Sequence, residues 1–402
     1  MQAAPRVASL PTFVRTCLVV PYDLAEEGGV KRHALHLAAA MREVGDEVDV
    51  VGPLSRGAAP PHVRGFGGVV NVPANGADNR MSLLASPWSV AAYLRARRPD
   101  VVHLHEPMVP LLPYYAVWFS YPAARVATFH MYAEQEPAVS RVARSLLARL
   151  LFPSLSAAIA VSPAAADYAA PVWRRPLAII PNGVPTATYH PNGNGSSNGS
   201  SHPSTNGHAT SPKIADPVRL LFVGSWRDRR KGLPVLLDAF RRLREAGHAI
   251  TLDVIGQGPN GPPSAIDGVT YHGMVATEAA LAEHYRHCDL FVSPATGQES
   301  FGIVLLEAMA SGRAVVCTAI RGYRDLVDPA GARLVPPGDA AALAEAIAGL
   351  LPDAEKRRAM GEVNRRRAEA YDWRQVAVRV REVYQEALRT HRSSRAALVA
   401  GA

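Results

Sequence analysis

Cysteine is scarce in this chain, which has 402 residues and three cysteines, Cys17, Cys288 and Cys317. They lie far apart in apolar, strand-like contexts, so we expect neither a disulfide framework nor a thiolate metal site. Long apolar runs are also lacking, and none is long enough to span a bilayer. Residues 1–13 contain no continuous apolar segment followed by a cleavage site. We therefore expect a cytoplasmic protein.

Acidic residues are outnumbered, with 35 Asp and Glu against 43 Lys and Arg, which gives a net charge of +8 and a pI near 9.6. Such a balance favours an anionic partner. No recognition module or aromatic stacking platform accompanies the charge, so nucleic acid is not a predicted partner. The basic groups at 356–358 and 365–367 fall on helix-like sequence, and we interpret them as solvated faces.

The length favours two domains or more. Residues 191–217 are rich in Gly, Ser and Asn and cannot bury enough apolar surface to fold, so they are predicted to be a flexible linker or insertion. We expect an N-terminal domain over 1–190 and a C-terminal domain over 218–372. A helix over 373–390 would return to the N-terminal domain, and 391–402 would be a disordered tail.

Strand-like and helix-like runs alternate on both sides of the linker. This pattern predicts an α/β protein with two doubly wound, Rossmann-like domains, in which ligands bind beyond the carboxyl ends of parallel strands. The expected strands span 15–20, 47–51, 100–104, 125–129, 157–161 and 177–180 in the first half, and 218–223, 250–255, 290–292 and 314–317 in the second.

Two carboxylates, Glu299 and Glu307, lie eight positions apart on either side of a glycine and an aliphatic stretch. We expect Glu299 in a loop after a buried strand, a helix starting near Ser300, and Glu307 two turns inside that helix. The carboxylates would then be about 12 Å apart along the axis, which suits two ends of one elongated ligand. Free amides of residues 302–304 would face an anion between them. The alternative is a surface helix with two unrelated glutamates.

Polar residues also follow the expected strands of the first half. The pair Gly28 and Gly29 precedes a helix, where glycines let the backbone approach a ligand. His130 stands alone at a strand exit, where it could orient a substrate hydroxyl or simply be a buried loop histidine. His103, His105 and Glu106 could form a metal site, but a fourth ligand is not evident, and we predict no metal.

In the second half a cluster of cations follows the first expected strand. Arg227, Arg230 and Lys231 lie between this strand and an amphipathic helix, where they could neutralise a diphosphate leaving group, with Lys231 the first choice. A solvated loop of charges is the alternative. Gly256 ends the next strand in a glycine turn that could line a base or ribose pocket.

Together these residues resemble the retaining nucleotide-sugar glycosyltransferases of family four, which have the GT-B fold, and most of all its phosphatidyl-myo-inositol mannosyltransferase group. The resemblance implies two Rossmann-like domains facing across a cleft. The matching segments are Pro21-Tyr22, Gly28-Gly29-Val30, His105-Glu106-Pro107, Ala127-Thr128-Phe129-His130, Ile180-Pro181-Asn182-Gly183-Val184, Arg230-Lys231-Gly232, Glu299 to Gly312 and Tyr371-Asp372-Trp373.

The resemblance implies roles for the donor residues. Glu299 would lie at the transferred sugar, Glu307 would bind the ribose, Lys231 the diphosphate, and Gly29 would border the diphosphate. Amides of Gly302, Ile303 and Val304 complete the predicted donor site.

On the acceptor side, Tyr22 would stack on or hydrogen-bond the acceptor, beside Gly28, and His130 would contact the sugar or the acceptor. The family usually has an arginine directly after the strand-end glycine, where this chain has Ser225. Arg227 or Arg230 would have to substitute for that arginine.

The implied reaction moves a hexose, mannose from GDP-mannose, to a lipid-linked or polyol acceptor such as phosphatidylinositol, with retention. Basic groups and amides would replace a metal, and no cofactor is expected. The alternatives are a UDP-sugar transferase with another acceptor, a nucleotide-sugar epimerase or phosphorylase of the same fold, and a non-catalytic nucleotide-sugar-binding module.

The segment Ala138 to Phe152 has an amphipathic pattern, with arginines on one side and leucines on the other. Such a helix can lie on an anionic bilayer, which makes peripheral association with the inner face of the cell membrane a secondary prediction. Packing of its apolar face on the sheet is the alternative.

Overall fold

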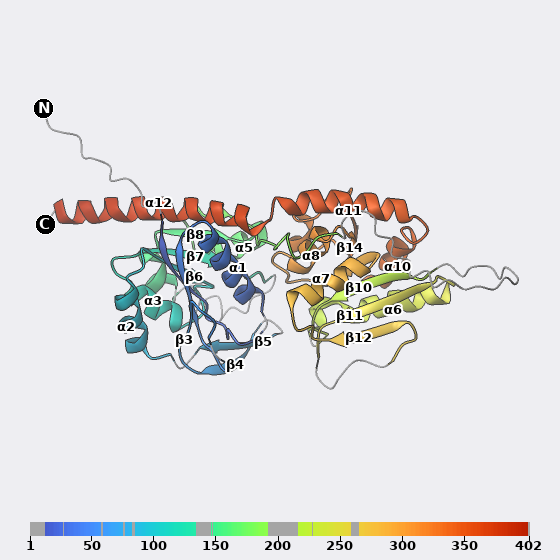
Figure 1. Ribbon diagram of the computed structural model, residues 1–402, viewed down its shortest axis with the longest axis horizontal. Helices are drawn as coiled ribbons and strands as arrows, with labels where there is room; N and C mark the ends of the chain where they lie inside the picture. The colour runs from blue at the N-terminus through green and yellow to red at the C-terminus, as the bar shows by residue number, and fades with distance from the viewer. Residues whose placement is uncertain are drawn as a thin grey trace, which may run out of the picture. The chain divides into compact units, whose positions relative to one another are not determined.

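The protein folds into two compact units, which are described separately below (Figure 1). The first comprises Met1–Gly183, Gln298–Phe301 and Tyr371–Ala402, and the second Val184–Gly297 and Gly302–Ala370. The computed structural model describes residues 13–26, 28–57, 59–74, 77–82, 85–133, 146, 148–191, 216–226, 228–258 and 265–400. The predicted linker lies almost wholly outside these residues, as does most of the amphipathic segment over 138–152.

The first unit is built on a seven-stranded sheet in the order β3-β2-β1-β6-β7-β8-β9, and all its strand pairs are parallel. All six strands expected in this half are present. A parallel sheet covered on both faces needs strands that are apolar on both sides, and β1 and β6 are almost wholly buried. The strands are β1 (Arg15–Val19), β2 (Glu47–Gly52), β3 (Val63–Gly65), β6 (Val101–His105), β7 (Ala124–Phe129), β8 (Ala157–Ala160) and β9 (Ala178–Ile179), and a separate antiparallel pair is β4 (Val69–Ala74) with β5 (Ala77–Ser82).

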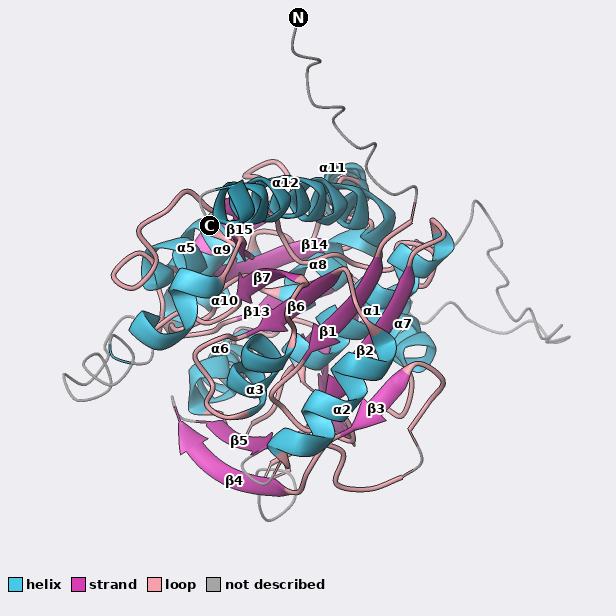
Figure 2. Cartoon of the chain, turned by 90° about the vertical axis from the view of Figure 1, so that its left-hand side faces the viewer, coloured by secondary structure: helices cyan, strands magenta, loops and turns pink. Residues whose placement is uncertain are grey.

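Helices cover both faces of this sheet (Figure 2). One hydrophobic core lies between the sheet and α1 and α12, and another lies under α2 and α3. The chain order reverses between β1 and β6, which are neighbours in the sheet, and the carboxyl ends of strands beside such a reversal are where open α/β sheets bind ligands. The helices are α1 (Gly29–Glu43), α2 (Pro87–Arg97), α3 (Leu112–Phe119), the 3-10 turn η1 (Phe152–Ser154), α5 (Pro163–Ala169) and α12 (Trp373–Ala400).

The last helix, α12, packs on the first sheet, as the sequence predicted. Its buried side chains, among them Trp373, Val380 and Tyr384, belong to the same core as α1. The helix continues to Ala400, so the predicted end at 390 and the predicted disordered tail over 391–402 are wrong as far as Ala400. The physical reason is that residues 391–400 contain neither proline nor glycine, so nothing stops the helix.

The second unit is built on a six-stranded parallel sheet in the order β12-β11-β10-β13-β14-β15. It contains the four strands expected here and adds β12 and β15 at its edges. The strands are β10 (Val218–Val223), β11 (Ile250–Ile255), β12 (Val269–Gly273), β13 (Leu290–Ser293), β14 (Ala314–Thr318) and β15 (Ala332–Val335).

Helices α6 and α10 enclose the core on one face of this sheet. Helices α8 and α11 pack on each other and on β14. The chain order reverses between the neighbouring strands β10 and β13, so their exits are the place to look for a ligand. The helices are η2 (Arg229–Lys231), α6 (Leu233–Glu245), α7 (Glu278–His287), α8 (Ile303–Ala310), α9 (Arg321–Arg324), α10 (Ala340–Ala348) and α11 (Ala354–Glu369).

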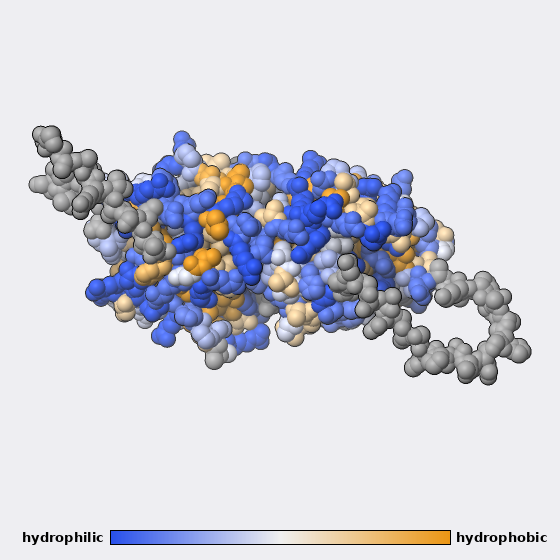
Figure 3. All heavy atoms as spheres, turned by 45° about the horizontal axis from the view of Figure 1, so that its top comes forward, coloured by the Kyte–Doolittle hydropathy of each residue, from blue (hydrophilic) through white to orange (hydrophobic). Residues whose placement is uncertain are grey.

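The arginines of α11 are not simply a solvated face, although hydrophilic residues cover much of the side that carries this helix (Figure 3). Arg357 donates to the carbonyls of Leu350 and Leu351, both at 2.7 Å. Arg365 donates to the carbonyls of Tyr189 and Ala310 at 2.9 and 2.8 Å. These half-buried guanidinium groups donate to backbone carbonyls of other elements, which is a structural role.

Candidate functional site

In the second unit, the chain segments that follow β10 and β13 are pressed against each other. Gly232 has a left-handed φ of 77°, and a Cβ there would lie 1.9 Å from the carbonyl oxygen of Pro294. The backbone N–H of Thr296 donates to the carbonyl of Arg230 at 2.8 Å. The β10–η2 turn is therefore fixed beside the loop that leads to α8, and Lys231 is part of that turn.

Helix α8 begins at Ile303 and presents free backbone amides. Its N-cap, Gly302, has a φ of 91° and makes no side-chain capping bond. A Cβ at Gly302 would lie 2.8 Å from the ring of Tyr323, so only glycine fits. The first intrahelical bond runs from Leu305 to Gly302, which leaves the N–H groups of Ile303 and Val304 available for an anion.

Glu307 is 2 % exposed and is held by a side chain from α7. The hydroxyl of Tyr285 donates to Glu307 Oε2 at 2.9 Å and lies 3.2 Å from the carbonyl oxygen of Val304. Because α8 begins at Ile303 and not near Ser300, Glu307 lies one turn into the helix rather than two. The left-handed backbone at residue 302 is the physical reason for this later start.

Glu299, the other predicted carboxylate, is half-buried and lies in the segment Gln298–Phe301. This segment clusters with the first unit, whereas Glu307 belongs to the second. Gln298 has a positive φ of 59°, and the Phe301 ring lies 6.1 Å from that of Tyr371. Positive φ in a residue other than glycine is costly and is concentrated at functional loops.

The predicted cations differ in what their side chains do. Arg230 is committed to Asp228, with Nε to Oδ1 at 2.9 Å and Nη2 to Oδ2 at 2.7 Å. Lys231 is half-buried. Ser225, which replaces the expected arginine, donates to the carbonyl of Gln257 at 2.7 Å and so ties the exit of β10 to that of β11. Arg227 lies outside the described residues.

Gly256 follows β11 with a φ of 141°, a conformation that side chains rarely adopt. Its N–H donates to the carbonyl of Gly273 at 2.9 Å. The next glycine, Gly258, faces the indole of Trp226, which also contacts Tyr271 with ring centroids 5.7 Å apart. The exit of β11 is thus shaped by backbone contacts and by an aromatic side chain, and a base or ribose pocket beside Gly256 stays a prediction.

In the first unit, His130 follows β7 and is held from two sides. Its backbone N–H donates to Glu106 Oε1 at 2.6 Å, and its Nε2 shares a hydrogen bond of 3.0 Å with His105 Nδ1. Glu106 has a φ of 51° in the turn after β6. Burial lowers the pKa of both His105 and His130 well below the usual value, so both are neutral near pH 7.

His33 of α1 reaches the same place. Its Nδ1 lies 2.7 Å from Asn182 Oδ1, and its ring meets those of His130 and Trp373 edge to face, at 4.7 and 5.0 Å. Burial lowers the pKa of His33 to about 4, although the Asn182 bond opposes that shift. His103 is fixed separately: its two ring nitrogens bond Tyr384 and Thr128 at 2.7 and 2.6 Å.

Tyr22 and the glycine pair flank this cluster at the exit of β1. Burial raises the pKa of Tyr22, and the nearby Glu106 carboxylate adds to the effect. Gly28 is exposed and has an extended backbone with φ −174°, and a Cβ added there would meet nothing within 4 Å. The fold would accept a larger residue at position 28, so the glycine there leaves open space at the start of α1.

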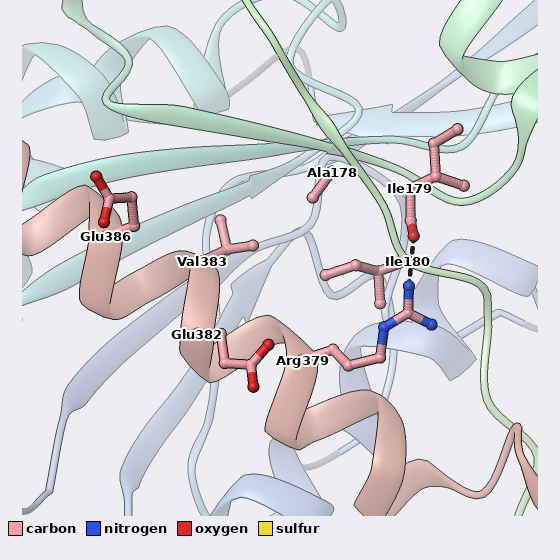
Figure 4. A pocket seen from close by; sticks show the side chains of 7 residues that line it. All are labelled: Ala178, Ile179, Ile180, Arg379, Glu382, Val383 and Glu386. Carbon is pink, nitrogen blue, oxygen red and sulfur yellow. Dashed lines mark hydrogen bonds between the residues drawn. The ribbon is translucent and has the colours of Figure 1, made fainter.

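A surface hollow of about 420 Å³ lies elsewhere in the first unit, between β9 and α12 (Figure 4). Arg379 crosses it and donates to the carbonyl of Ile179 at 2.6 Å. None of the predicted site residues lines it. The lining residues are Ala178, Ile179, Ile180, Arg379, Glu382, Val383 and Glu386.

Comparison with known proteins assigns the chain to a family. Residues 27–188 match Glycosyltransferase Family 4, and residues 217–353 match Glycosyl transferases group 1. The phosphatidyl-myo-inositol mannosyltransferase of Mycobacterium leprae is 32% identical over 92% of this chain and 96% of the relative. The protein of that name from Mycolicibacterium smegmatis is 32% identical over 92% of this chain and 94% of its own. The chain belongs to glycosyltransferase family 4.

Solved structures agree on the fold of this family 4 glycosyltransferase. Sucrose-phosphate synthase from Thermosynechococcus elongatus has a TM-score of 0.69 at 22% identity, covering 92% of this chain and 98% of that one. WaaG, a glycosyltransferase involved in lipopolysaccharide biosynthesis, has a TM-score of 0.64 at 18% identity, covering 92% of this chain and 99% of that one. The predicted GT-B fold, with two parallel-sheet α/β domains, is confirmed, and the chain is an enzyme that transfers a hexose.

The sequence missed two supporting residues of this family 4 glycosyltransferase. Tyr285, which holds Glu307, lies on another helix, and Asn182, which bonds His33, lies in a loop after β9. The only available signal for Asn182 was its place in the Ile180–Val184 motif. His103, His105 and Glu106, which the sequence analysis considered as a metal site, do not form one. Both ring nitrogens of His103 are engaged in hydrogen bonds to Tyr384 and Thr128.

Proposed function

We propose that this glycosyltransferase moves a mannosyl group from GDP-mannose to a phosphatidylinositol acceptor, with retention of the anomeric configuration. The relatives named phosphatidyl-myo-inositol mannosyltransferase, 32% identical over 92% of the chain, support this choice of sugar and acceptor. The geometric observation that carries the proposal is the exit of β13, where the free amides of α8 lie between the loop beside Lys231 and the buried Glu307.

The second unit would hold the donor nucleotide. The N–H groups of Ile303 and Val304 and the positive end of α8 attract the diphosphate, and Lys231 adds a full positive charge. Glu307 would accept hydrogen bonds from the ribose hydroxyls, because a carboxylate has more lone pairs than the one that the Tyr285 hydroxyl uses. Gly256 would border the ribose, and Arg230 acts through Asp228 to shape the loop.

The first unit would hold the acceptor and the reacting sugar. Neutral His130 offers a hydrogen bond to a sugar or acceptor hydroxyl, and Tyr22 and Gly28 lie at the neighbouring strand exit. Gly29 begins α1 and would border the diphosphate, as the family resemblance implies. Glu299 would contact the transferred mannose from its half-buried loop.

The proposed reaction is a same-face displacement. The bond between the anomeric carbon and the diphosphate oxygen breaks, and the acceptor oxygen forms a new bond on the same face. The departing diphosphate takes the proton of the acceptor hydroxyl. Amides and Lys231 stabilise the charge that develops on the leaving group, so we propose that transfer requires no divalent metal and no cofactor.

Nucleotide binding tests the donor half of the proposal. Calorimetric titration with GDP and UDP, in buffer containing EDTA, should show tighter binding of GDP. Glu345→Gln, an exposed change on α10 of the same unit, is the matched control for Glu307→Gln and should bind GDP like the parent. Equal affinity for both nucleotides would refute the choice of donor, and tighter binding of UDP would favour a UDP-sugar transferase. No binding of either nucleotide would refute the whole site.

We also propose peripheral membrane association through the first unit. Among the described residues, no helix is long and apolar enough to cross a membrane. Three aromatic side chains in the region of α2 and α3 are largely exposed: Trp88 on α2 by 77%, Trp118 on α3 by 57% and Tyr121, just after α3, by 66%. The Trp88 ring also lies 6.5 Å from that of Phe119. Exposed tryptophan and tyrosine are typical of side chains that sit at a membrane–water interface.

Leu146 and Leu150, at the described end of the predicted amphipathic segment, are 56% and 66% exposed. The parent protein should sediment with phosphatidylinositol vesicles, and the double variant Trp88→Ser/Trp118→Ser should stay in the supernatant. Met274→Ser, which changes an exposed apolar side chain of the second unit, is the control and should sediment like the parent. Equal sedimentation of the parent and the double variant would refute this surface.

A further inference from the structure

Three buried histidines from different parts of the first unit meet beneath the exits of β6 and β7. They are His33 from α1, His105 at the end of β6, and His130 directly after β7. One ring nitrogen from each lies within 4.8 Å of the other two. Their exposures are 4%, 0% and 8%, so the small opening to solvent is on the side of His33 and His130.

The hydrogen bonds of the cluster leave ring nitrogens with lone pairs. An amide oxygen only accepts, so Asn182 Oδ1 places the proton of His33 on Nδ1 and the lone pair on Nε2. His105 and His130 share one hydrogen bond, and His105 Nε2 is buried without a partner among the described residues. A buried imidazole nitrogen with no partner is unusual, and His105 Nε2 can take up the ring proton when His105 Nδ1 binds a ligand.

We propose that His33, His105 and His130 form a binding site for one transition metal ion, with Zn²⁺ the best fit, and that occupation of this site inhibits sugar transfer. The inhibition rests on the proposed function of His130, because an ion bound to His130 Nε2 pulls the ring towards His33 and His105 and so moves it away from a sugar or acceptor hydroxyl. The binding itself does not rest on that function. This site is distinct from the metal-free chemistry proposed for transfer.

The geometry is close to what the ion needs. Tetrahedral zinc holds imidazole nitrogens at about 2.0–2.1 Å, which places two ligand nitrogens about 3.3 Å apart. The bonded nitrogens, His105 Nδ1 and His130 Nε2, are 3.0 Å apart, so this pair has to open by only a few tenths of an ångström. For both to bind the ion, the proton in this bond has to move to the other nitrogen of its own ring. The third ring has to approach from at most 4.8 Å. Three protein ligands leave a fourth position for water.

The surroundings of His33 also resemble those of a metal ligand. A metal-bound imidazole usually donates its other N–H to a carbonyl or carboxylate oxygen, which fixes the tautomer and the ring orientation. Asn182 supplies that oxygen at 2.7 Å, and the Trp373 ring holds the imidazole from another side at 5.0 Å. Since the three histidines are neutral near pH 7, binding displaces no proton from them.

The donor set predicts which ions bind. Imidazole suits Zn²⁺, Co²⁺, Ni²⁺ and Cu²⁺, whereas Mg²⁺ and Ca²⁺ require oxygen ligands. Titration of EDTA-dialysed protein with Zn²⁺ should give one tight site per chain, and Mg²⁺ should not compete. With Co²⁺, the visible absorption should show the strong bands of a tetrahedral nitrogen site.

Variants locate the site. His33→Ala should weaken Zn²⁺ binding by at least about 100-fold, and Asn182→Leu, which removes only the orienting oxygen, by about 10- to 100-fold. His272→Ala/His284→Ala is the matched control, because these two histidines lie together in the second unit with ring centroids 4.6 Å apart. It should leave the tight site unchanged. Circular dichroism identifies a variant that fails to fold, and Asn182→Leu then carries the test.

The inhibition has its own readout. Sugar transfer should proceed in EDTA, stop when one equivalent of Zn²⁺ is bound, and return when EDTA is added. Transfer in EDTA without any tight Zn²⁺ site would overturn this inference and leave the proposed function intact. Tight Zn²⁺ binding by a protein that transfers no sugar in EDTA would support the metal site and refute the proposed function. Zn²⁺ binding that survives His33→Ala and Asn182→Leu, or that is lost in the His272/His284 control, would also overturn the site.

Discussion

Replacing Glu307 by glutamine tests the donor site with little change to the fold. Glu307 is 2% exposed and accepts a hydrogen bond of 2.9 Å from Tyr285, which is itself fully buried. Glutamine has the same shape and keeps an oxygen that Tyr285 can reach. The substitution therefore removes the negative charge and one acceptor oxygen, and leaves the packing of α7 on α8 in place.

The expected loss of affinity follows from the hydrogen bonds to ribose. A hydrogen bond to a charged group contributes about 1.5–3 kcal/mol, and one between neutral groups about 0.5–1.5 kcal/mol. The difference of about 1–2 kcal/mol corresponds to GDP binding that is about 5- to 30-fold weaker. Because Tyr285 keeps a partner, the free energy of unfolding should change by less than about 1 kcal/mol.

Calorimetry with GDP and urea unfolding measure the two quantities on the same preparations. Glu345→Gln removes an equal charge from the surface of the same unit and should leave both unchanged. A dissociation constant of Glu307→Gln within about twofold of the parent would show that the ribose does not contact Glu307. An equal loss in Glu345→Gln would show that only the overall charge matters.

Three further predictions concern Lys231, Gly302 and His33. Lys231→Ala should weaken GDP binding by about 10- to 150-fold, because one charge-assisted hydrogen bond is lost. Arg229→Ala makes an equal charge change at an exposed nearby residue and should leave GDP binding unchanged. Equal effects of the two substitutions would contradict binding of the diphosphate by Lys231. Gly302→Ala forces a side chain into a φ of 91° and against Tyr323, so urea unfolding should show a loss of about 2–3 kcal/mol, and an unchanged midpoint would contradict it. His33 has its pKa lowered from 6.5 to about 4, so its contribution to stability is complete above pH 6.5 and is lost as the pH falls towards 4, by about 1.4 kcal/mol per pH unit. Urea unfolding at several pH values between 4 and 6.5 should show that the free energy of unfolding depends less steeply on pH in His33→Asn than in the parent. An equal dependence on pH would mean that His33 is protonated in the folded protein.

The strands of both sheets could be predicted because parallel strands buried on two faces are continuous apolar runs. The edge strands β3, β12 and β15 were not predicted, because edge strands are less continuously apolar. β12 (Val269–Gly273) has exposed residues alternating with half-buried ones, and β3 (Val63–Gly65) is too short to give a pattern. The predicted end of α12 was also wrong, because residues 391–400 contain no proline or glycine that would stop the helix.

Candidate site residues could be chosen from the sequence where one segment carries both the chemistry and the turn. Lys231 lies in the turn between a strand and a helix, and Glu307 lies in the helix that a glycine precedes. Contacts between distant segments left no such signal: Tyr285 and Glu307 are paired across two helices, and His33 meets His130 only after α1 folds onto the sheet. Periodicity describes one element at a time and does not state which side chains of different elements meet.

Transfer to lipid is the most direct test of the central claim. The purified protein is incubated with GDP-mannose and phosphatidylinositol vesicles in the presence of EDTA, and the lipid fraction is analysed by mass spectrometry and NMR. We predict one added hexose per lipid, joined by the same anomeric configuration as in the donor, and no product from Glu299→Gln. A product of inverted configuration, or no glycosylated lipid with intact donor recovered, would contradict the account.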